Sequence, residues 1–514
     1  MAEKLHLPEW TEIGQDTGLD PLAMVRPTEA LYQRLVPGIS TITLRLRYYA
    51  FFPWLLEQYA RTIGDTSLDT FRVFQRRAEA LYALIGVSRI GPDDVYETGI
   101  TGAIWASRTL SDGGDVYNFA DAAAPDAEIR YLKNKAGAYG AIYAGQLGEM
   151  GLVRVADGHP IDIADERGRQ VAAAFAESVR DQDALFLEVV ERGIVTPDEL
   201  ERLSVFKSGR IPEGSEEQRL LRALLVGGFE KPLRTDEARK QTMLKLLELA
   251  DQLGRRPRPE DAKWAWYNTE TMPGVLKAGV GSLSLALWRL YHTNDLLRLA
   301  YEGMFKRALG VLASMPRRAL TLTNLVEEVV AESELPGTSW AEFQIETTQG
   351  AADLGERDFE EAISRSGGQD GVIQPETLRA AVGLLAVVLS RAEDQSELIE
   401  HEFGPYGSTH FRSLASERRF IDDRASAPAA DVLAAVLKER VIKRHLWVAA
   451  RKLRTQRAYT YLADVTDGEL RFRSSFAATL SNPRLEQSLT FLTDAGLLDA
   501  DGLTPRGREA LASA

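Results

Sequence analysis

Apolar residues recur at helical spacing through most of the chain. One side of a predicted helix over Phe71–Val87 collects five of them: Phe71, Phe74, Ala78, Leu81 and Ile85. The same spacing predicts helices over Tyr131–Met150, Leu220–Leu225, Met243–Leu253, Leu283–Leu299 and Leu378–Val388. No series of strands suited to a parallel sheet is evident in the sequence. We therefore predict a mainly α, multi-helical fold.

The aromatic stretch around Leu44–Trp54 has two interpretations. Alternation of apolar residues from Ile42 to Tyr48 is typical of a strand, whereas Pro53 is typical of the first turn of a helix. Arg45 and Arg47 lie among these aromatic residues. Arginine packed on rings inside a domain is the favoured interpretation, and a ligand-binding pair is the alternative.

A basic helix is predicted near the C-terminus. Its apolar side carries Ile442, Leu446, Ala449 and Leu453. The opposite side is basic with one aromatic residue: Arg440, Lys443, Arg444, Trp447, Arg451 and Arg454. Between Lys438 and Arg473 there are ten Lys or Arg and four Asp or Glu, a net charge of +6, although the whole chain carries −14. Such a local excess indicates an anionic partner or an acidic surface of the same chain.

The residues after this helix follow a recognisable order. A hairpin is predicted around the turn Asp467-Gly468, then a helix from Pro483 to Gly496, a short wing at Leu497–Leu503 and a last helix from Pro505. This order resembles winged-helix domains over residues 438–514. A similar pattern, with Gly151 and Arg167-Gly168 in place of Gly496 and Arg506-Gly507, predicts a second winged-helix-like unit over 131–178. The predicted fold therefore has small β-hairpin wings and winged-helix-like units near both ends.

These patterns suggest three domains. They are an N-terminal helical domain at 1–180, a helical middle domain at 181–423 and a C-terminal winged-helix module at 424–514, after a linker near Asp423–Asp431. A length of 514 residues is ordinary for about two to four domains. The helix from Pro483 offers Arg484 against Glu486 and Asp494, which suits a DNA groove poorly and favours protein docking.

The composition limits the cellular compartment and the kinds of catalytic, metal and cofactor site that we expect. With no cysteine there are no disulfides, thiolate metal sites or cysteine nucleophiles, and we expect a cytoplasmic protein without a membrane partner. The sequence has no P-loop, and Gly279–Ser284 lacks the third glycine of a dinucleotide loop. The six histidines show no paired ligand spacing. We expect no metal and no cofactor, and a binding protein rather than an enzyme.

The sequence thus favours a non-catalytic subunit of a bacterial multi-component assembly, binding DNA or docking proteins, in chromosome maintenance or antiviral defence. Duplex DNA and a protein partner, with an ATPase as one candidate, are the expected partners. The alternatives are a metal-dependent nuclease that uses the winged helix to deliver DNA, and a ligand-responsive transcription regulator. The residues predicted to contact nucleic acid are Arg440, Lys443, Arg444, Trp447, Arg451, Arg454, Arg471 and Arg473.

Overall fold

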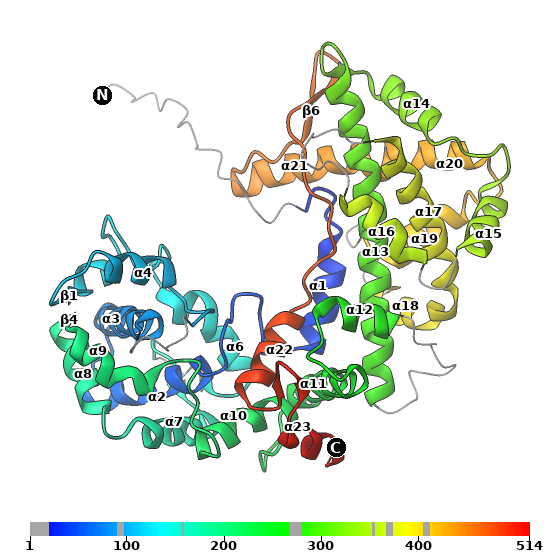
Figure 1. The fold of residues 1–514 in the computed structure, drawn as a ribbon. Coiled ribbons are helices and arrows are strands. Elements are labelled where there is room, and N and C mark those ends of the chain that lie inside the picture. The colour runs from blue at the N-terminus through cyan, green and yellow to red at the C-terminus, as the bar shows by residue number, and fades with distance from the viewer. Residues whose placement is uncertain are drawn as a thin grey trace, which may run out of the picture. The chain divides into compact units, whose positions relative to one another are not determined.

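The computed structural model describes residues 20–89, 97–155, 159–267, 280–351, 355–365, 374–404 and 412–513. These residues form two compact units. Unit 1 contains Met1–Leu31 and Lys263–Ser481, and unit 2 contains Tyr32–Ala262 and Asn482–Ala514. The chain therefore enters unit 1, builds most of unit 2, returns to unit 1 and ends in unit 2 (Figure 1). The boundary passes through two helices, α1 (Val25–Leu35) and α12 (Pro259–Tyr267).

Unit 2 is helical with three two-stranded antiparallel sheets. Its sheets pair β1 (Tyr117–Asn118) with β4 (Ile194–Val195), β2 (Val153–Arg154) with β3 (Ile163–Ala164), and β8 (Leu498–Asp499) with β9 (Gly502–Leu503). Its helices are α2 (Tyr48–Thr62), α3 (Leu68–Val87), α4 (Ala103–Ser111), α5 (Ala120–Ala123), the π-helix η1 (Tyr139–Tyr143), α6 (Ala144–Glu149), α7 (Glu166–Val179), α8 (Asp183–Arg192), α9 (Pro197–Arg202), the 3₁₀ turn η2 (Leu203–Phe206), α10 (Glu216–Val226), α11 (Arg234–Leu253), α22 (Leu485–Asp494) and α23 (Pro505–Ala512).

The ambiguous aromatic stretch contains no strand: residues 42–47 form turns and irregular structure, and helix α2 begins at Tyr48. Pro53 lies inside this helix, and all of its aromatic side chains are buried. Arg47 is fully buried, 5.1 Å from the ring centre of Phe175, with its Nε 2.7 Å from Glu217. Arg47 is thus an arginine packed on a ring inside the core, as the favoured interpretation predicts. Arg45 instead pairs with Asp494, at 2.8 Å.

The repeat predicted from the sequence is visible in the local structure of unit 2. In each copy a helix ends at a glycine with positive φ, Gly151 or Gly496, and a two-stranded hairpin and a second helix follow. A second glycine lies on the first turn of the second helix, where a Cβ would collide with the carbonyl oxygen of Leu152 or Leu497. The Arg-Gly pairs therefore mark close backbone packing of hairpin on helix.

Unit 1 is arranged along α13 (Val280–Ser314), the long helix in Figure 1. Among the elements that pack on it are α14 (Leu322–Glu332), α16 (Gly355–Arg365), α17 (Pro375–Arg391) and the π-helix η6 (Val436–Ile442). The other elements are α15 (Trp340–Gly350), the 3₁₀ turn η4 (Glu393–Gln395), α18 (Ser396–Phe403), α19 (Leu414–Asp422), α20 (Ala429–Ala435), α21 (Lys443–Gln456) and the strands β5 (Ala319–Leu320), β6 (Ala463–Thr466) and β7 (Glu469–Phe472).

The predicted mainly α fold with small β-hairpins is confirmed. The units, however, are not divided at the predicted boundaries of 1–180, 181–423 and 424–514. Residues 424–481 belong to unit 1, whereas 482–514 belong to unit 2. The reason is that each half of the predicted C-terminal module has its packing partners elsewhere: η6 and β7 pack on α13, and α22 and α23 pack on α11. No described helix combines the length and the apolar character that a membrane span requires.

Candidate nucleic-acid interface

Helix α21 carries most of the residues predicted to bind nucleic acid, but its buried face differs from the prediction. The helix buries Arg444, His445, Val448 and Ala449, whereas Leu453, predicted to point inward, is 43% exposed. The buried arc is therefore rotated toward Arg444. Two polar residues, Arg444 and His445, can lie on this arc because each has a hydrogen-bond partner within unit 1.

Arg444 does not belong to an exposed basic face, contrary to the prediction. Its side chain is 1% exposed and its Nη2 lies 2.7 Å from the carboxylate of Glu417 on α19. Arg440, one turn earlier, is also largely covered: its Nε lies 3.7 Å from Glu417 and its guanidinium stacks 4.2 Å from the ring centre of Phe420. The acidic partner that balances part of this basic segment is therefore a residue of the same chain.

His445 connects α21 to two other segments of unit 1. Its Nε2 accepts a hydrogen bond of 3.0 Å from the Leu462 N–H, just before β6, and its Nδ1 lies 3.3 Å from the Pro21 carbonyl oxygen. Burial lowers the pKa of His445 to about 4, so the ring is neutral at physiological pH. The neutral tautomer with a proton on Nδ1 satisfies both contacts.

One side of α21 from Trp447 onward, together with Arg457 directly after the helix, is exposed and basic. Trp447 is 45% exposed, and the guanidinium of Arg451 lies 5.6 Å from its ring centre. Arg451, Arg454 and Arg457 are exposed, and Lys452 is partly exposed. We call these five residues the basic end of α21: Trp447, Arg451, Lys452, Arg454 and Arg457. Lys443, on the same helix, is exposed but pairs with Glu439 at 2.8 Å.

The predicted hairpin is present. Strands β6 and β7 pair from Ala463 opposite Phe472 to Thr466 opposite Glu469. Asp467 and Gly468 both have positive φ, 54° and 80°, as a two-residue turn of type I′ requires. Strand β5 adds a third strand, with Ala319 opposite Arg471. Nothing in the sequence indicated this two-residue strand, because so short a segment has no measurable periodicity.

The hairpin arginines differ in their surroundings. Arg473 is exposed at the end of β7 and pairs with Asp464 of the neighbouring strand, at 2.7 Å. Arg471 lies opposite the same Asp464 in the strand register and is partly buried. Both arginines therefore sit beside an acidic residue of their own hairpin, which weakens their predicted role as contacts for phosphate.

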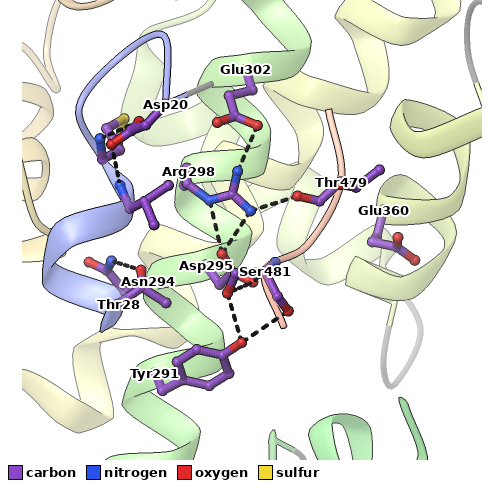
Figure 2. Close-up of polar contacts among 12 residues, drawn as sticks. Asp20, Thr28, Tyr291, Asn294, Asp295, Arg298, Glu302, Glu360, Thr479 and Ser481 are labelled. Atoms are coloured by element: carbon purple, nitrogen blue, oxygen red, sulfur yellow. Dashed lines mark hydrogen bonds and ion pairs between the residues drawn. The ribbon is translucent and has the colours of Figure 1, made fainter. Parts of the chain in front are cut away.

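A buried polar network on α13 fixes the segment that follows the hairpin. Figure 2 shows Arg298 between the carboxylates of Glu302 and Asp295, at 2.7 and 2.9 Å. Arg298 also donates to the Thr479 carbonyl oxygen at 2.6 Å, and Asp295 accepts from the Ser481 N–H at 2.7 Å. Helix α13 thereby holds residues 479–481 in an extended path between β7 and unit 2.

Further contacts close this network. Lys263 donates to the Ser481 carbonyl oxygen at 2.7 Å, and the Tyr291 hydroxyl lies 2.9 Å from the Ser481 hydroxyl. Burial alone would raise the pKa of Asp295, but the cations of Arg298 and Lys263 outweigh it and lower this pKa. At Glu302 burial outweighs Arg298 and raises the pKa to about 7. This network was not predicted from the sequence, although charges spaced three and four residues apart in an otherwise apolar helix are a signal for one.

Helix α22, whose charges suit a DNA groove poorly, has two of them largely buried, Arg484 just before the helix and Asp494 at its end, whereas Glu486 is exposed. Arg484 is buried in unit 2, donates to the Ile39 carbonyl oxygen and lies 5.2 Å from the ring centre of Tyr32. Asp494 at the other end of α22 holds Arg45. Arg484 and Asp494 thus serve the packing of unit 2, which explains a charge composition that suits a groove poorly.

The described residues include no group of three or more His, Asp or Glu side chains that could hold a metal ion. Comparisons with known proteins found no matching family model, no similar curated protein and no similar solved structure.

Proposed function

We propose that this chain is a non-catalytic subunit that binds duplex DNA through the basic end of α21. The observation that supports this proposal is the charge of Lys443–Arg457, which contains six Lys or Arg and no Asp or Glu. Two of the six, Lys443 and Arg444, have carboxylate partners. The other four are Arg451, Lys452, Arg454 and Arg457, and none of them forms an ion pair with another residue in the described parts of the chain.

Such a surface is suited to contact with the phosphate groups of a duplex. Four cations within two turns repel one another, and binding to the phosphates of a duplex relieves this repulsion while releasing condensed counterions. Trp447 adds a flat apolar surface beside Arg451, which suits contact with a sugar or a base. The chain as a whole carries −14 and repels DNA at long range, so binding depends on this local patch.

A binding subunit of this kind would serve a multi-component assembly, with an ATPase as a partner, in chromosome maintenance or defence against foreign DNA. The basic end would contact phosphates and not base edges, so we expect little preference for DNA sequence.

The test is the salt dependence of duplex binding by the full chain. Replacing Arg451 and Arg454 with Gln should weaken binding to every duplex sequence. It should also lower the slope of log K against log salt by about 1.8, since each phosphate contact contributes about 0.9. A matched control replaces Arg357 and Arg365 with Gln. Those two arginines are also exposed on a helix of unit 1 and carry the same charge.

The control variant should keep the wild-type slope. Equal effects of the two double substitutions would show that only net charge matters, and the proposed surface would be wrong. Absence of duplex binding by the wild-type chain at low salt would refute the proposal altogether.

A further inference from the structure

Two arginines of unit 1 contact one buried carboxylate, and a third, Arg412, lies near enough for its charge to interact with all three groups. Arg440 and Arg444 both approach Glu417, at 3.7 and 2.7 Å. Arg412 precedes α19, is half-buried and lies with its guanidinium 5.7 Å from the ring centre of Trp447. We call Arg412, Arg440, Arg444 and Glu417 the arginine cluster.

The charges of this cluster do not balance. Glu417 is fully buried and provides one negative charge against three positive charges. Arg412 forms no ion pair with any residue in the described ranges, and Glu417 is the only described carboxylate within 4.0 Å of Arg440 or Arg444. The cluster therefore carries a net charge of +2 in a largely desolvated place.

Several of its N–H groups also lack acceptors. Nε and Nη1 of Arg444 and Nε of Arg440 are buried and have no hydrogen-bond partner among the described residues. The side chain of Arg444 is only 1% exposed, so water does not readily replace those partners. Burial, together with the neighbouring charges of Arg444 and Arg440, lowers the pKa of Arg412 to about 10.

Buried cations without partners are costly, and folded proteins usually pair them or bind an anion to them. Most of the cost disappears if a dianion occupies the cluster, because the net charge then falls to about zero. A phosphate monoester or inorganic phosphate carries about −1.5 to −2 at pH 7, whereas a backbone phosphodiester carries one charge. Guanidinium groups also match the geometry of phosphate oxygens with paired N–H donors.

We propose that the arginine cluster is a binding site for a phosphate dianion, contacted by the partly exposed guanidiniums of Arg412 and Arg440 and supported by the charge of Arg444. The ligand is either the terminal phosphate of a nucleic acid or a small phosphorylated molecule, since both offer the same dianion. Trp447 connects the cluster to the basic end of α21, because Arg412 and Arg451 both lie against its ring. This inference does not rest on the proposed function, since it follows from the charge imbalance of the cluster alone.

The test is calorimetric titration of the full chain with inorganic phosphate in chloride buffer at constant ionic strength. Arg412→Gln should weaken phosphate binding at least about tenfold, the equivalent of one bidentate charged contact. Arg412 has no carboxylate partner among the described residues, so its loss leaves no described acid unpaired. Arg451→Gln is the matched control: Arg451 stacks on the same Trp447 but lies outside the cluster, and its loss should change the affinity less than about twofold.

Arg412→Lys keeps the charge and tests the case in which Arg412→Gln does not fold. It should retain part of the affinity, between that of the wild type and Arg412→Gln. A wild-type chain that binds no phosphate would overturn the inference, and so would equal phosphate affinities of Arg412→Gln and Arg451→Gln.

Duplexes with 5′-phosphate and 5′-hydroxyl ends then distinguish the two sources. Tighter binding of the phosphorylated duplex, lost in Arg412→Gln, would identify a terminal phosphate as the ligand. Equal binding of both duplexes, beside clear binding of inorganic phosphate, would identify a small phosphorylated molecule. Failure of the proposed function would leave the phosphate titration unchanged, so the two proposals can fail separately.

Discussion

Unit 1 contains two buried clusters of charged residues that differ in their balance of cations and carboxylates. In the network on α13, two carboxylates, Asp295 and Glu302, face two cations, Arg298 and Lys263, and main-chain groups of residues 479–481 take up further hydrogen bonds. In the arginine cluster, three guanidiniums face the one carboxylate of Glu417, and several buried N–H groups have no acceptor among the described residues. Both clusters border the same helix, because Tyr301 of α13 lies 5.6 Å from the guanidinium of Arg444.

The balance of charge separates a structural network from a binding site. When a buried network contains both the cations and the carboxylates that balance them, packing alone accounts for it. The network on α13 attaches an extended segment to the helix. Packing does not account for a buried cluster that lacks counter-charges, since no described residue offsets the free-energy cost of desolvating its cations. An external anion is the missing part of such a cluster.

Breaking the balanced network should have the largest effect. Asp295→Asn leaves Arg298 and Lys263 with a single carboxylate and removes the charge that accepts from Ser481. Loss of one partner from a buried ion pair costs roughly 3–5 kcal/mol, so we expect a fall of this size in the free energy of unfolding of unit 1. Urea unfolding, with hydrogen exchange of peptides from α13 to identify the unit that opens, measures it.

Arg357→Gln is the control for this experiment, because it breaks an exposed pair with Glu361 on α16. Its cost should stay within about 0.5 kcal/mol. Similar losses for both substitutions would mean that the α13 network contributes no more than a surface ion pair.

Removing the one carboxylate of the arginine cluster should have an intermediate effect that depends on the buffer. Glu417→Gln raises the net charge of the cluster from +2 to +3 and breaks the contact with Arg444. We expect a loss of roughly 2–3 kcal/mol in chloride, less than for Asp295→Asn because Arg440 remains partly exposed. Phosphate should restore about 1 kcal/mol or more, since a ligand of the folded state stabilises it.

Asp295→Asn should respond differently in the same two buffers. Its loss of stability should be equal in chloride and phosphate at constant ionic strength, because the α13 network needs no external anion. If Glu417→Gln also behaves equally in the two buffers, the arginine cluster is a scaffold like the other.

Sequence patterns predicted the features that depend on neighbours along the chain. The helix Phe71–Val87 lies within α3, the turn Asp467-Gly468 joins β6 to β7, and the repeated glycines mark the hairpins of unit 2. Each of these follows from residues within about one or two turns of one another. The repeat was therefore visible in the sequence even though its two copies are separated by most of the chain.

The candidate site depended on distant residues, and the sequence could predict only half of it. A helical wheel places Arg444 on the basic side of α21, but the fold buries it because Glu417, 27 residues earlier, provides a charge at 2.7 Å. Arg451 and Arg454 lie where the pattern predicts, on the exposed side. Burial of a charged residue depends on its partner in space, and a single sequence does not reveal which residue that partner is.

The smallest of the three effects concerns pH. Burial raises the pKa of Glu302 to about 7, above the ordinary value of about 4.3, so the folded chain holds this proton more tightly than the unfolded chain. The contribution of Glu302 to stability is therefore fully present below about pH 4 and is lost as the pH rises through about 7. Glu302→Gln cannot ionise and should lack this pH dependence.

The quantity to measure is the free energy of unfolding of the wild type minus that of Glu302→Gln, at pH 6 and at pH 8. It should fall by roughly 1–2 kcal/mol between the two, because pH 6 lies one unit below the pKa of about 7 and one unit equals about 1.4 kcal/mol. Burial lowers the pKa values of His292 and His445 to about 3 and 4, which gives the opposite dependence, but both histidines are present in both proteins and cancel in the difference. A constant difference would show that Arg298 keeps Glu302 ionised over this range, so that the α13 network stays balanced between the two pH values.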